Sequence, residues 1–314
     1  MIPFLLRRLL EGIPTLLLVT VLVFSITRIL PGDPVRLMLG EETDPEIMRE
    51  VRKSFGLDRP IPVQYAEWLY GLLLADLGRS LRDNTQVTKL IGDKLPTTIE
   101  LSLLAIFFGT VIAIPAGVFS ALHRGSWWDG GVTALALSGI SIPNFFLGIL
   151  LIYVFSLKLG WVPPSGYEEP WKNLGKNLSL MLLPAITLGS ALAGGLTRLT
   201  RNSLLEVLSL DYIRTAQAKG LSKRVVIYKH ALRNAAIPIV TVMGLQFGGL
   251  LGGAVVSEQI FSIPGFGRLV VDAVFNRDFP VLQGLVLVSA LCIFVVNLTV
   301  DLLYAAIDPR ITYS

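Results

Sequence analysis

The chain has 314 residues, of which 53% are hydrophobic and only 16% are charged, and its mean hydropathy is positive. Soluble globular domains carry about 25% charged residues and about 45–50% apolar ones, so this composition indicates a membrane protein. The net charge of +4 is small, and the basic residues are spread between apolar runs, which argues against nucleic-acid binding. The sequence contains neither HExxH nor GxxxxGK[ST], and its one cysteine excludes an intrachain disulfide, so we expect no metal site and no ATP-binding phosphate loop in this chain.

Six segments are long and apolar enough to cross a bilayer as helices, which takes about 20 residues. Their predicted limits are 9–30, 101–122, 132–157, 178–196, 235–256 and 281–306. No small-residue cleavage site follows the first segment, so we expect an uncleaved helix and not a signal peptide. Proline interrupts several segments, which is tolerated where neighbouring helices satisfy the freed backbone groups. The sequence therefore predicts an all-α integral membrane protein with six transmembrane helices.

These spans divide the chain into four parts. Residues 1–30 hold a cytoplasmic N-terminus and the first helix, and residues 31–96 form a small extracytoplasmic domain. Residues 97–306 form the core of helices two to six, with a long loop at 198–234, and residues 307–314 form a cytoplasmic tail. In the outer domain, an amphipathic stretch with Trp68 and Tyr70 either packs as a cap on the bundle or docks a partner. Lysine and arginine are concentrated in the loops on one side, so the positive-inside rule places both termini and the long loop in the cytoplasm.

The loop at 198–234 contains a short polar helix with recognisable ends. Ser209 or Asp211 can cap its start, Lys219 lies in its last turn, and Gly220 suits the left-handed position that ends a helix. One side of this helix is small and apolar, made by Tyr212, Ile213, Ala216 and Gly220. The basic residues of the loop are explained either by topology alone or by docking to a partner through this apolar face. The ordered helix ends favour docking.

Polar residues at membrane depth are costly and often functional. We select Asn144 in the third span, Gln246 in the fifth and Glu258 at the outer end of the fifth as candidates for lining a transport pathway. The alternative is a structural hydrogen bond for the first two, and an ordinary water-facing helix end for Glu258. In the sixth span, Asp301 can pair with one of three arginines, namely Arg198, Arg201 and Arg233. Gly244, Gly248 and Gly252 recur every four residues, which allows close packing within the chain or against another subunit.

Several stretches resemble one family of transport proteins. The segment "RTAQAKG" resembles the glutamate-alanine-alanine motif in membrane permeases of bacterial ABC importers, with Arg214 where glutamate is usual, Thr215 and Ala216 at the alanines, and Gly220 at the glycine. The segments "LPGDPVRLMLG", "FGLDRPIPVQY", "HALRN", "IPGFGRLVVDAVFNRDFPVLQG" and "VDLLYAAIDPR" are similar to the dipeptide/oligopeptide/nickel branch, and to its B-type permease in particular. Together these segments extend over essentially the whole chain.

The resemblance implies the type I ABC importer permease fold, in the bacterial inner membrane, and a division of labour. A C-type permease would complete the pore, two cytoplasmic ATPases would each take up a coupling helix, and an extracytoplasmic binding protein would deliver the substrate. The coupling helix of this chain would comprise Asp211, Tyr212, Ile213, Arg214, Thr215, Ala216, Lys219 and Gly220. The expected substrate is a dipeptide or oligopeptide, with glutathione or nickel chelates as alternatives.

Two other classes of function fit the sequence less well. A stand-alone secondary transporter needs coupling-ion sites within its own spans, and these spans carry few charges. An intramembrane enzyme needs a catalytic constellation, and none is evident at membrane depth. We therefore expect an importer subunit with no catalytic residue and no cofactor of its own, because the resemblance implies that ATP hydrolysis lies on separate ATPase subunits.

Overall fold

The computed structural model describes residues 2–29, 35, 44–54 and 56–307. Within this part of the chain, the regular elements are all helices, and a single isolated β-bridge pairs Arg79 with Gln86. This confirms the all-α prediction. The chain divides into two compact units. The first unit comprises Met1–Pro96 and Gly265–Val295, and the second comprises Thr97–Pro264 and Val296–Ser314.

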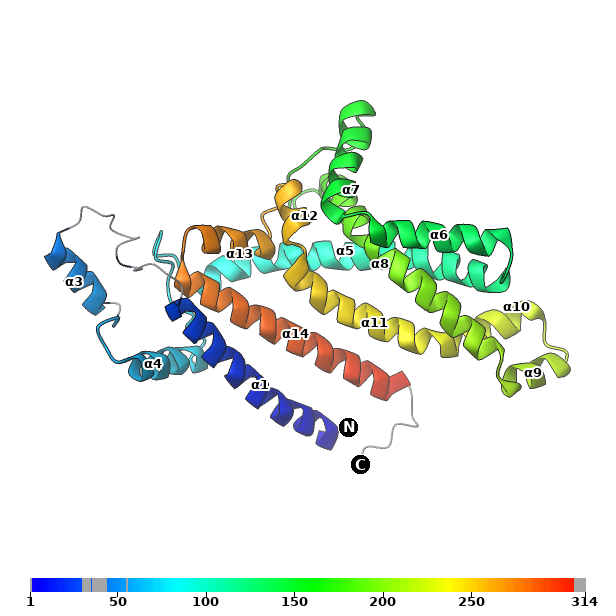
Figure 1. The fold of residues 1–314 in the computed structure, drawn as a ribbon, viewed down its shortest axis with the longest axis horizontal. Helices are drawn as coiled ribbons and strands as arrows, with labels where there is room; N and C mark the ends of the chain where they lie inside the picture. Colours follow the sequence, from blue (N-terminus) through cyan, green and yellow to red (C-terminus); the bar gives the residue numbers. More distant parts are fainter. Residues whose placement is uncertain (1, 30–34, 36–43, 55, 308–314) are drawn as a thin grey trace. The chain divides into compact units, whose positions relative to one another are not determined.

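The first unit is built from helices at both ends of the sequence (Figure 1). Its elements are α1 (Ile2–Ile29), α3 (Pro45–Ser54), α4 (Ile61–Leu73), the start of α5 (Val87–Leu122), α13 (Phe266–Phe275) and most of α14 (Phe279–Ile307). Helix α4 packs on α1 through aromatic rings, because the ring of Phe24 lies 5.4 Å from that of Tyr65 and 5.7 Å from that of Trp68. Trp68 therefore packs within the chain, while Tyr70 is exposed. The extracytoplasmic placement of residues 31–96 stays a prediction, and residues 30–34 and 36–43 lie outside the described part.

A buried carboxylate fixes the turn before α5. Asp278 accepts a hydrogen bond of 2.5 Å from the Ser80 hydroxyl and one of 3.1 Å from the backbone N–H of Leu81. The apolar core of this unit lies beside it and consists of Val87, Ile91, Phe266, Ala273, Val281 and Leu285. Buried carboxylates need such donors, so this turn has one favoured position against the start of α14.

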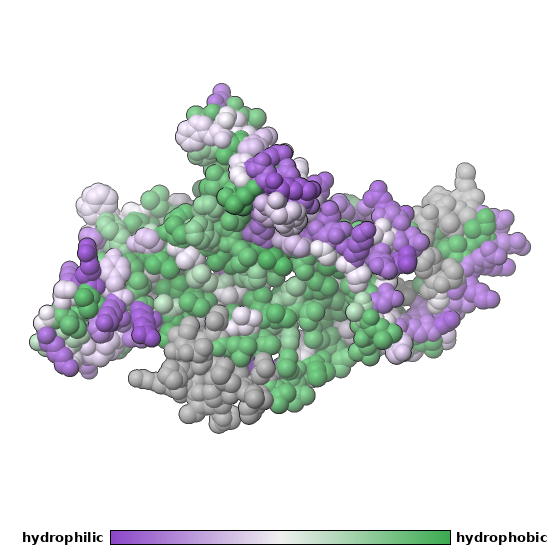
Figure 2. All heavy atoms as spheres, turned by 180° about the vertical axis from the view of Figure 1, so that it is seen from behind, coloured by the Kyte–Doolittle hydropathy of each residue, from purple (hydrophilic) through white to green (hydrophobic). Residues whose placement is uncertain are grey.

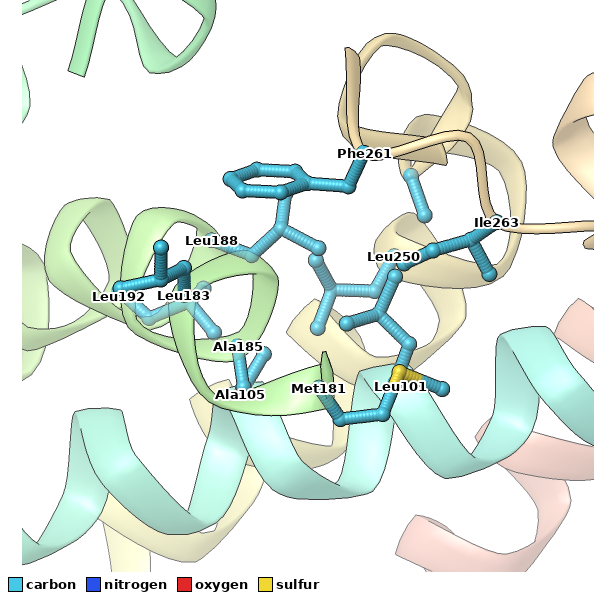
Figure 3. Close-up of a cluster of buried hydrophobic side chains, with 11 residues drawn as sticks. Leu101, Ala105, Met181, Leu183, Ala185, Leu188, Leu192, Leu250, Phe261 and Ile263 are labelled. Carbon is cyan, nitrogen blue, oxygen red and sulfur yellow. The ribbon is translucent and has the colours of Figure 1, made fainter. Parts of the chain in front are cut away.

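The second unit is arranged around the long helix α8 (Leu174–Leu208). Its other elements are the rest of α5, α6 (Trp127–Ser141), α7 (Asn144–Leu151), η1 (Ile152–Lys158), α9 (Asp211–Ala218), α10 (Lys223–Val225), η2 (Val226–Ala231), α11 (Leu232–Gly253) and α12 (Val255–Ile260). Leu101 of α5, Met181 and Leu188 of α8, Leu250 of α11 and Phe261 after α12 meet in one buried apolar cluster (Figure 3). This cluster joins segments that are far apart in the sequence.

Small residues allow α5 and α8 to approach closely. A methyl group added to Gly189 would lie 2.7 Å from the carbonyl oxygen of Ala105, and one added to Gly117 would lie 2.7 Å from the carbonyl oxygen of Thr197. The two backbones are therefore in contact at two depths, as expected where small side chains line a helix interface.

Five described helices are long and apolar enough to cross a membrane: Leu6–Thr27, Val87–Leu122, Leu174–Leu208, Lys223–Gly252 and Phe279–Leu302. The pair Trp127–Ser141 and Asn144–Lys158 makes a sixth if the two helices count as one span, but they are bent by 99°. The predicted span at 132–157 is therefore made of two helices joined at a sharp bend, and the break lies at Pro143, directly before Asn144. Pro143 disfavours the helical conformation at the residue before it, and Ile142 is extended, with φ −79° and ψ 122°.

Candidate functional site

The short helix predicted in the loop at 198–234 is present as α9, Asp211–Ala218, in the connection between α8 and α11, whereas its role in coupling stays a prediction. Gly220 follows it with φ +78°, which confirms the left-handed helix stop. The start differs from the prediction, because Leu210 is the capping residue and no side chain caps the helix. The hydroxyl of Ser209 instead donates to the carbonyl oxygen of Glu206, inside the end of α8.

The apolar face of α9 packs against this chain itself. Ile213 is fully buried and Ala216 is 8% exposed. They share one apolar cluster with the following residues of α5, α8, η2 and α11: Val118, Ala121, Leu204, Val226, Ile227, Ala231 and Ala235. The prediction that this face seats in another protein is therefore wrong for Ile213 and Ala216. Apolar partners in the same chain cover the face without the entropy cost of association.

The opposite face of α9 is exposed and polar. Its exposed members are Asp211, Tyr212, Arg214, Thr215, Gln217, Ala218, Lys219 and Gly220. The Tyr212 hydroxyl accepts a hydrogen bond of 2.6 Å from the side-chain amide of Asn234, so the start of α9 is tied to α11. Figure 2 shows hydrophilic residues gathered over α9 and α10, in contrast to the apolar surface of the long helices. This polar face is the part of α9 that a partner can contact.

The three pathway candidates occupy different environments. Asn144 is half-buried at the first residue of α7, directly after the bend. Gln246 is exposed on α11. Glu258 is fully buried and accepts a hydrogen bond from the Thr98 hydroxyl of α5. The expectation that Glu258 faces water or substrate is therefore wrong: α11 ends at Gly253, and the chain continues into α12, which carries Glu258 back against α5.

The glycines of α11 differ in how closely other residues pack against them. A methyl group on Gly244 would clash with Val300 of α14, so this position is used for packing within the chain. At Gly249 and Gly252 the same methyl group would meet nothing within 4 Å. The row of glycines is therefore covered by α14 at Gly244, whereas Gly249 and Gly252 have no close neighbour in the described part of the chain.

Comparison with known proteins identifies the family. Residues 113–313 match the family model "Binding-protein-dependent transport system inner membrane component", and residues 1–102 match the model of its N-terminal part. The chain belongs to this family. It is an inner-membrane permease component of an ABC importer and crosses the membrane several times.

Named relatives of this permease are similar over their full length. A protein from Salmonella choleraesuis (strain SC-B67), named glutathione transport system permease protein GsiC, is 45% identical over 314 residues, which is 100% of both chains. The protein of that name from Escherichia coli (strain K12) is 44% identical over the same length. An inward-facing structure of the MetNI methionine ABC transporter matches 70% of this chain and 96% of its own chain, with a TM-score of 0.59 and 18% identity. This likeness supports the type I importer permease fold alone.

The permease also holds a charged contact that the sequence did not reveal. Arg201 of α8 binds Asp129 of α6 with two hydrogen bonds, of 2.7 Å and 2.8 Å. The sequence suggested Arg201 as a partner of Asp301, whereas the structure pairs it with Asp129. The two residues are 72 positions apart, and the local pattern indicates only a helix start, where the Ser126 hydroxyl accepts a hydrogen bond from the backbone N–H of Asp129.

A second polar contact lies in the loop between η1 and α8. The Tyr167 hydroxyl donates a hydrogen bond of 2.9 Å to Glu100. Burial raises the pKa of Tyr167 to about 12, and the negative charge of Glu100 acts in the same direction. Nearby, Lys176 holds the pKa of the Glu168 carboxyl below its usual value through a hydrogen bond of 2.7 Å. These contacts fix the loop to α5 and to the start of α8.

Proposed function

We propose that this permease forms half of the translocation pore for glutathione or closely related short peptides. The observation that carries the proposal is the 45% identity, over the whole of both chains, to a permease named for glutathione transport. Glutathione is itself a modified tripeptide, so the proposal stays within the peptide class that the sequence predicts. Between the two expectations, the names of the relatives favour glutathione over a dipeptide or longer peptide.

The proposal includes three kinds of partner. A C-type permease completes the pore, two ATPase subunits hydrolyse ATP in the cytoplasm, and an extracytoplasmic binding protein delivers the substrate. Both termini and α9 lie on the cytoplasmic side. The geometry of α9 supports this arrangement, because a short helix with one face fixed to α5, α8 and α11 leaves its polar face for an ATPase.

Two residues remain candidates for the pathway. Gln246 exposes an amide on a helix that is otherwise apolar enough to span the bilayer. An amide facing lipid costs several kcal/mol if it finds no partner, so we infer that Gln246 faces a water-filled pathway or the partner permease. Asn144 begins a helix directly after a bend of 99°, and backbone breaks at membrane depth are tolerated where they line a cavity or are buried in protein.

Transport by reconstituted complexes tests the function. The purified permease is placed in vesicles with its C-type partner, ATPases and binding protein, and uptake of labelled glutathione is followed with ATP on the ATPase side. We expect uptake that depends on ATP, and that unlabelled glutathione suppresses more strongly than an unrelated dipeptide. Uptake by this permease without the ATPases would instead support a secondary transporter, and preference for the dipeptide would contradict the glutathione assignment.

Charge reversal on α9 tests the docking surface. Arg214 is exposed, with only a surface ion pair to Asp211 at 3.4 Å, so Arg214→Glu should leave folding intact. We expect this variant to insert normally and to retain less ATPase in a pull-down from detergent. Arg124→Glu is the matched control, since Arg124 is also exposed and basic but lies outside α9. Equal ATPase retention by both variants would place the docking surface elsewhere.

A further inference from the structure

The contact between Asp129 and Arg201 joins three helices of the second unit at one carboxylate. Arg201 contacts both carboxylate oxygens of Asp129, at 2.7 Å and 2.8 Å. The Ser120 hydroxyl of α5 donates to the same carboxylate at 2.5 Å, and the backbone N–H of Gly125, in the turn between α5 and α6, donates at 3.0 Å. Asp129 is only 6% exposed, so its charge is offset by these donors and hardly by water.

The guanidinium group is essential to this geometry. A two-point contact between arginine and a carboxylate fixes the orientation of both groups, whereas lysine can supply only a point charge. The Asp129–Arg201 pair therefore fixes the rotation of α8 relative to α6, and Ser120 brings α5 into the same arrangement. Removing one partner would leave a mostly buried charge uncompensated, which is strongly unfavourable.

The same region of α5 and α8 also carries the coupling helix. Leu204 follows Arg201 on α8 and is fully buried in the cluster that holds Ile213 of α9. On α5, Val118 and Ala121 flank Ser120 and belong to that cluster. The polar contact to α6 and the apolar contact to α9 therefore act on adjacent side chains of the same two helices.

We propose that Asp129 and Arg201 are positioning residues for energy coupling. The pair fixes the end of α8 that leads into α9, so that a displacement of α9 moves α5, α6 and α8 as one body. Without the pair, α9 can move while α6 stays behind, and ATP is hydrolysed without full opening of the pathway. This inference rests on the proposed function, because it requires that an ATPase displaces α9.

The test measures ATP hydrolysis and glutathione uptake in the same vesicles, with the full complex and its binding protein. Arg201→Lys keeps the charge but loses the two-point contact, and Ser120→Ala removes one hydrogen bond. Glu168→Gln is the matched control, because it removes an ion pair to Lys176 at the other end of α8. The amount of assembled complex, measured by subunit stoichiometry, normalises each rate.

For Arg201→Lys we expect assembly and ATP hydrolysis to persist while uptake per ATP falls about three-fold or more, within the range known for coupling mutations. Ser120→Ala should lower the same ratio less, and the control should leave it unchanged. A wild-type ratio in assembled Arg201→Lys would overturn the proposal. If Arg201→Lys fails to assemble, Ser120→Ala decides: a lowered ratio supports positioning, and an unchanged ratio reduces the pair to a folding contact.

The wild-type complex separates this inference from the proposed function. No ATP-dependent glutathione uptake by the wild-type complex would refute the proposed function. Normal wild-type uptake, together with an unchanged ratio in the variants, would refute the positioning role alone.

Discussion

Gly117 lies at one of the close approaches between α5 and α8, and Gly117→Ala should destabilise the permease. The added methyl group would lie 2.6 Å from the Cβ atom of Thr200 and 2.7 Å from the carbonyl oxygen of Thr197. Real Cβ atoms essentially never approach a neighbour closer than 3.0 Å, so one helix must move. A rotamer change at Thr200 cannot relieve the contact with the Thr197 backbone. Overpacking of this kind typically costs about 1–3 kcal/mol.

Gly195→Ala provides the matched control for this prediction. Gly195 also lies within a helix, α8, but a methyl group there meets nothing within 4 Å. Both replacements gain the same intrinsic helix propensity, about 1 kcal/mol, so this gain cancels when the two variants are compared. We expect Gly117→Ala to be less stable than Gly195→Ala by about 1–3 kcal/mol.

The assay is equilibrium unfolding of the purified permease in mixed micelles, with increasing denaturing detergent and tryptophan fluorescence as the signal. The midpoint for Gly117→Ala should be lower than that for Gly195→Ala, which should equal or exceed the wild-type midpoint. Coincident midpoints for the two variants would refute the close approach of α5 and α8 at Gly117.

Three further predictions follow from buried or hydrogen-bonded groups. Ile213→Ala should lower the free energy of unfolding by about 2–5 kcal/mol in the same assay, because the side chain is fully buried. Leu210→Ala should lower it far less, because the Leu210 side chain is 45% exposed. Equal losses of stability in the two variants would contradict the packing of α9. The Tyr167 hydroxyl should ionise near pH 12 instead of near 10.0, which can be measured as the difference in phenolate absorbance between the wild type and Tyr167→Phe. Because folding raises this pKa, the stability that the protonated hydroxyl contributes is present below pH 10 and is lost as the pH rises through 12. Asp278→Ala should speed amide hydrogen exchange at Leu81, in the turn before α5, because the backbone N–H of Leu81 loses its acceptor. An unchanged rate would show that the turn is held by other contacts.

The apolar spans could be predicted because hydropathy and length alone decide whether a helix is stable in a bilayer. The left-handed stop at Gly220 was also predictable, since glycine has no Cβ to oppose a φ of +78°. Hydropathy carries no information on the direction of a helix axis, however, and residues 132–157 are apolar on both sides of a 99° bend. Pro143 indicated a local break in that segment, but its size depends on the packing of α6 and α7 against α8.

Contacts between segments that are far apart in the chain could not be predicted from a single sequence. The predicted apolar face of α9 is real, but only the position of Val118 and Leu204 decides that Ile213 is covered by this chain. In the same way, the pairing of Asp129 with Arg201 depends on the angle between α6 and α8, which no local pattern records. The burial of Glu258 depends on where α11 ends, and helix ends are the least predictable part of a helix.

The structure separates two roles that the sequence had combined in α9. Ile213 and Ala216 attach the helix to the permease, so their replacement should reduce stability. Arg214, which stands where the related motif usually has glutamate, is 74% exposed on the other face, so its charge has little effect on the fold. We therefore propose that the basic residue at this position acts in recognition, and we expect the cognate ATPase to present acidic side chains to Arg214. If so, Arg214→Glu should weaken binding to that ATPase more than the neutral Arg214→Gln, whereas a purely structural role would make the two variants equivalent.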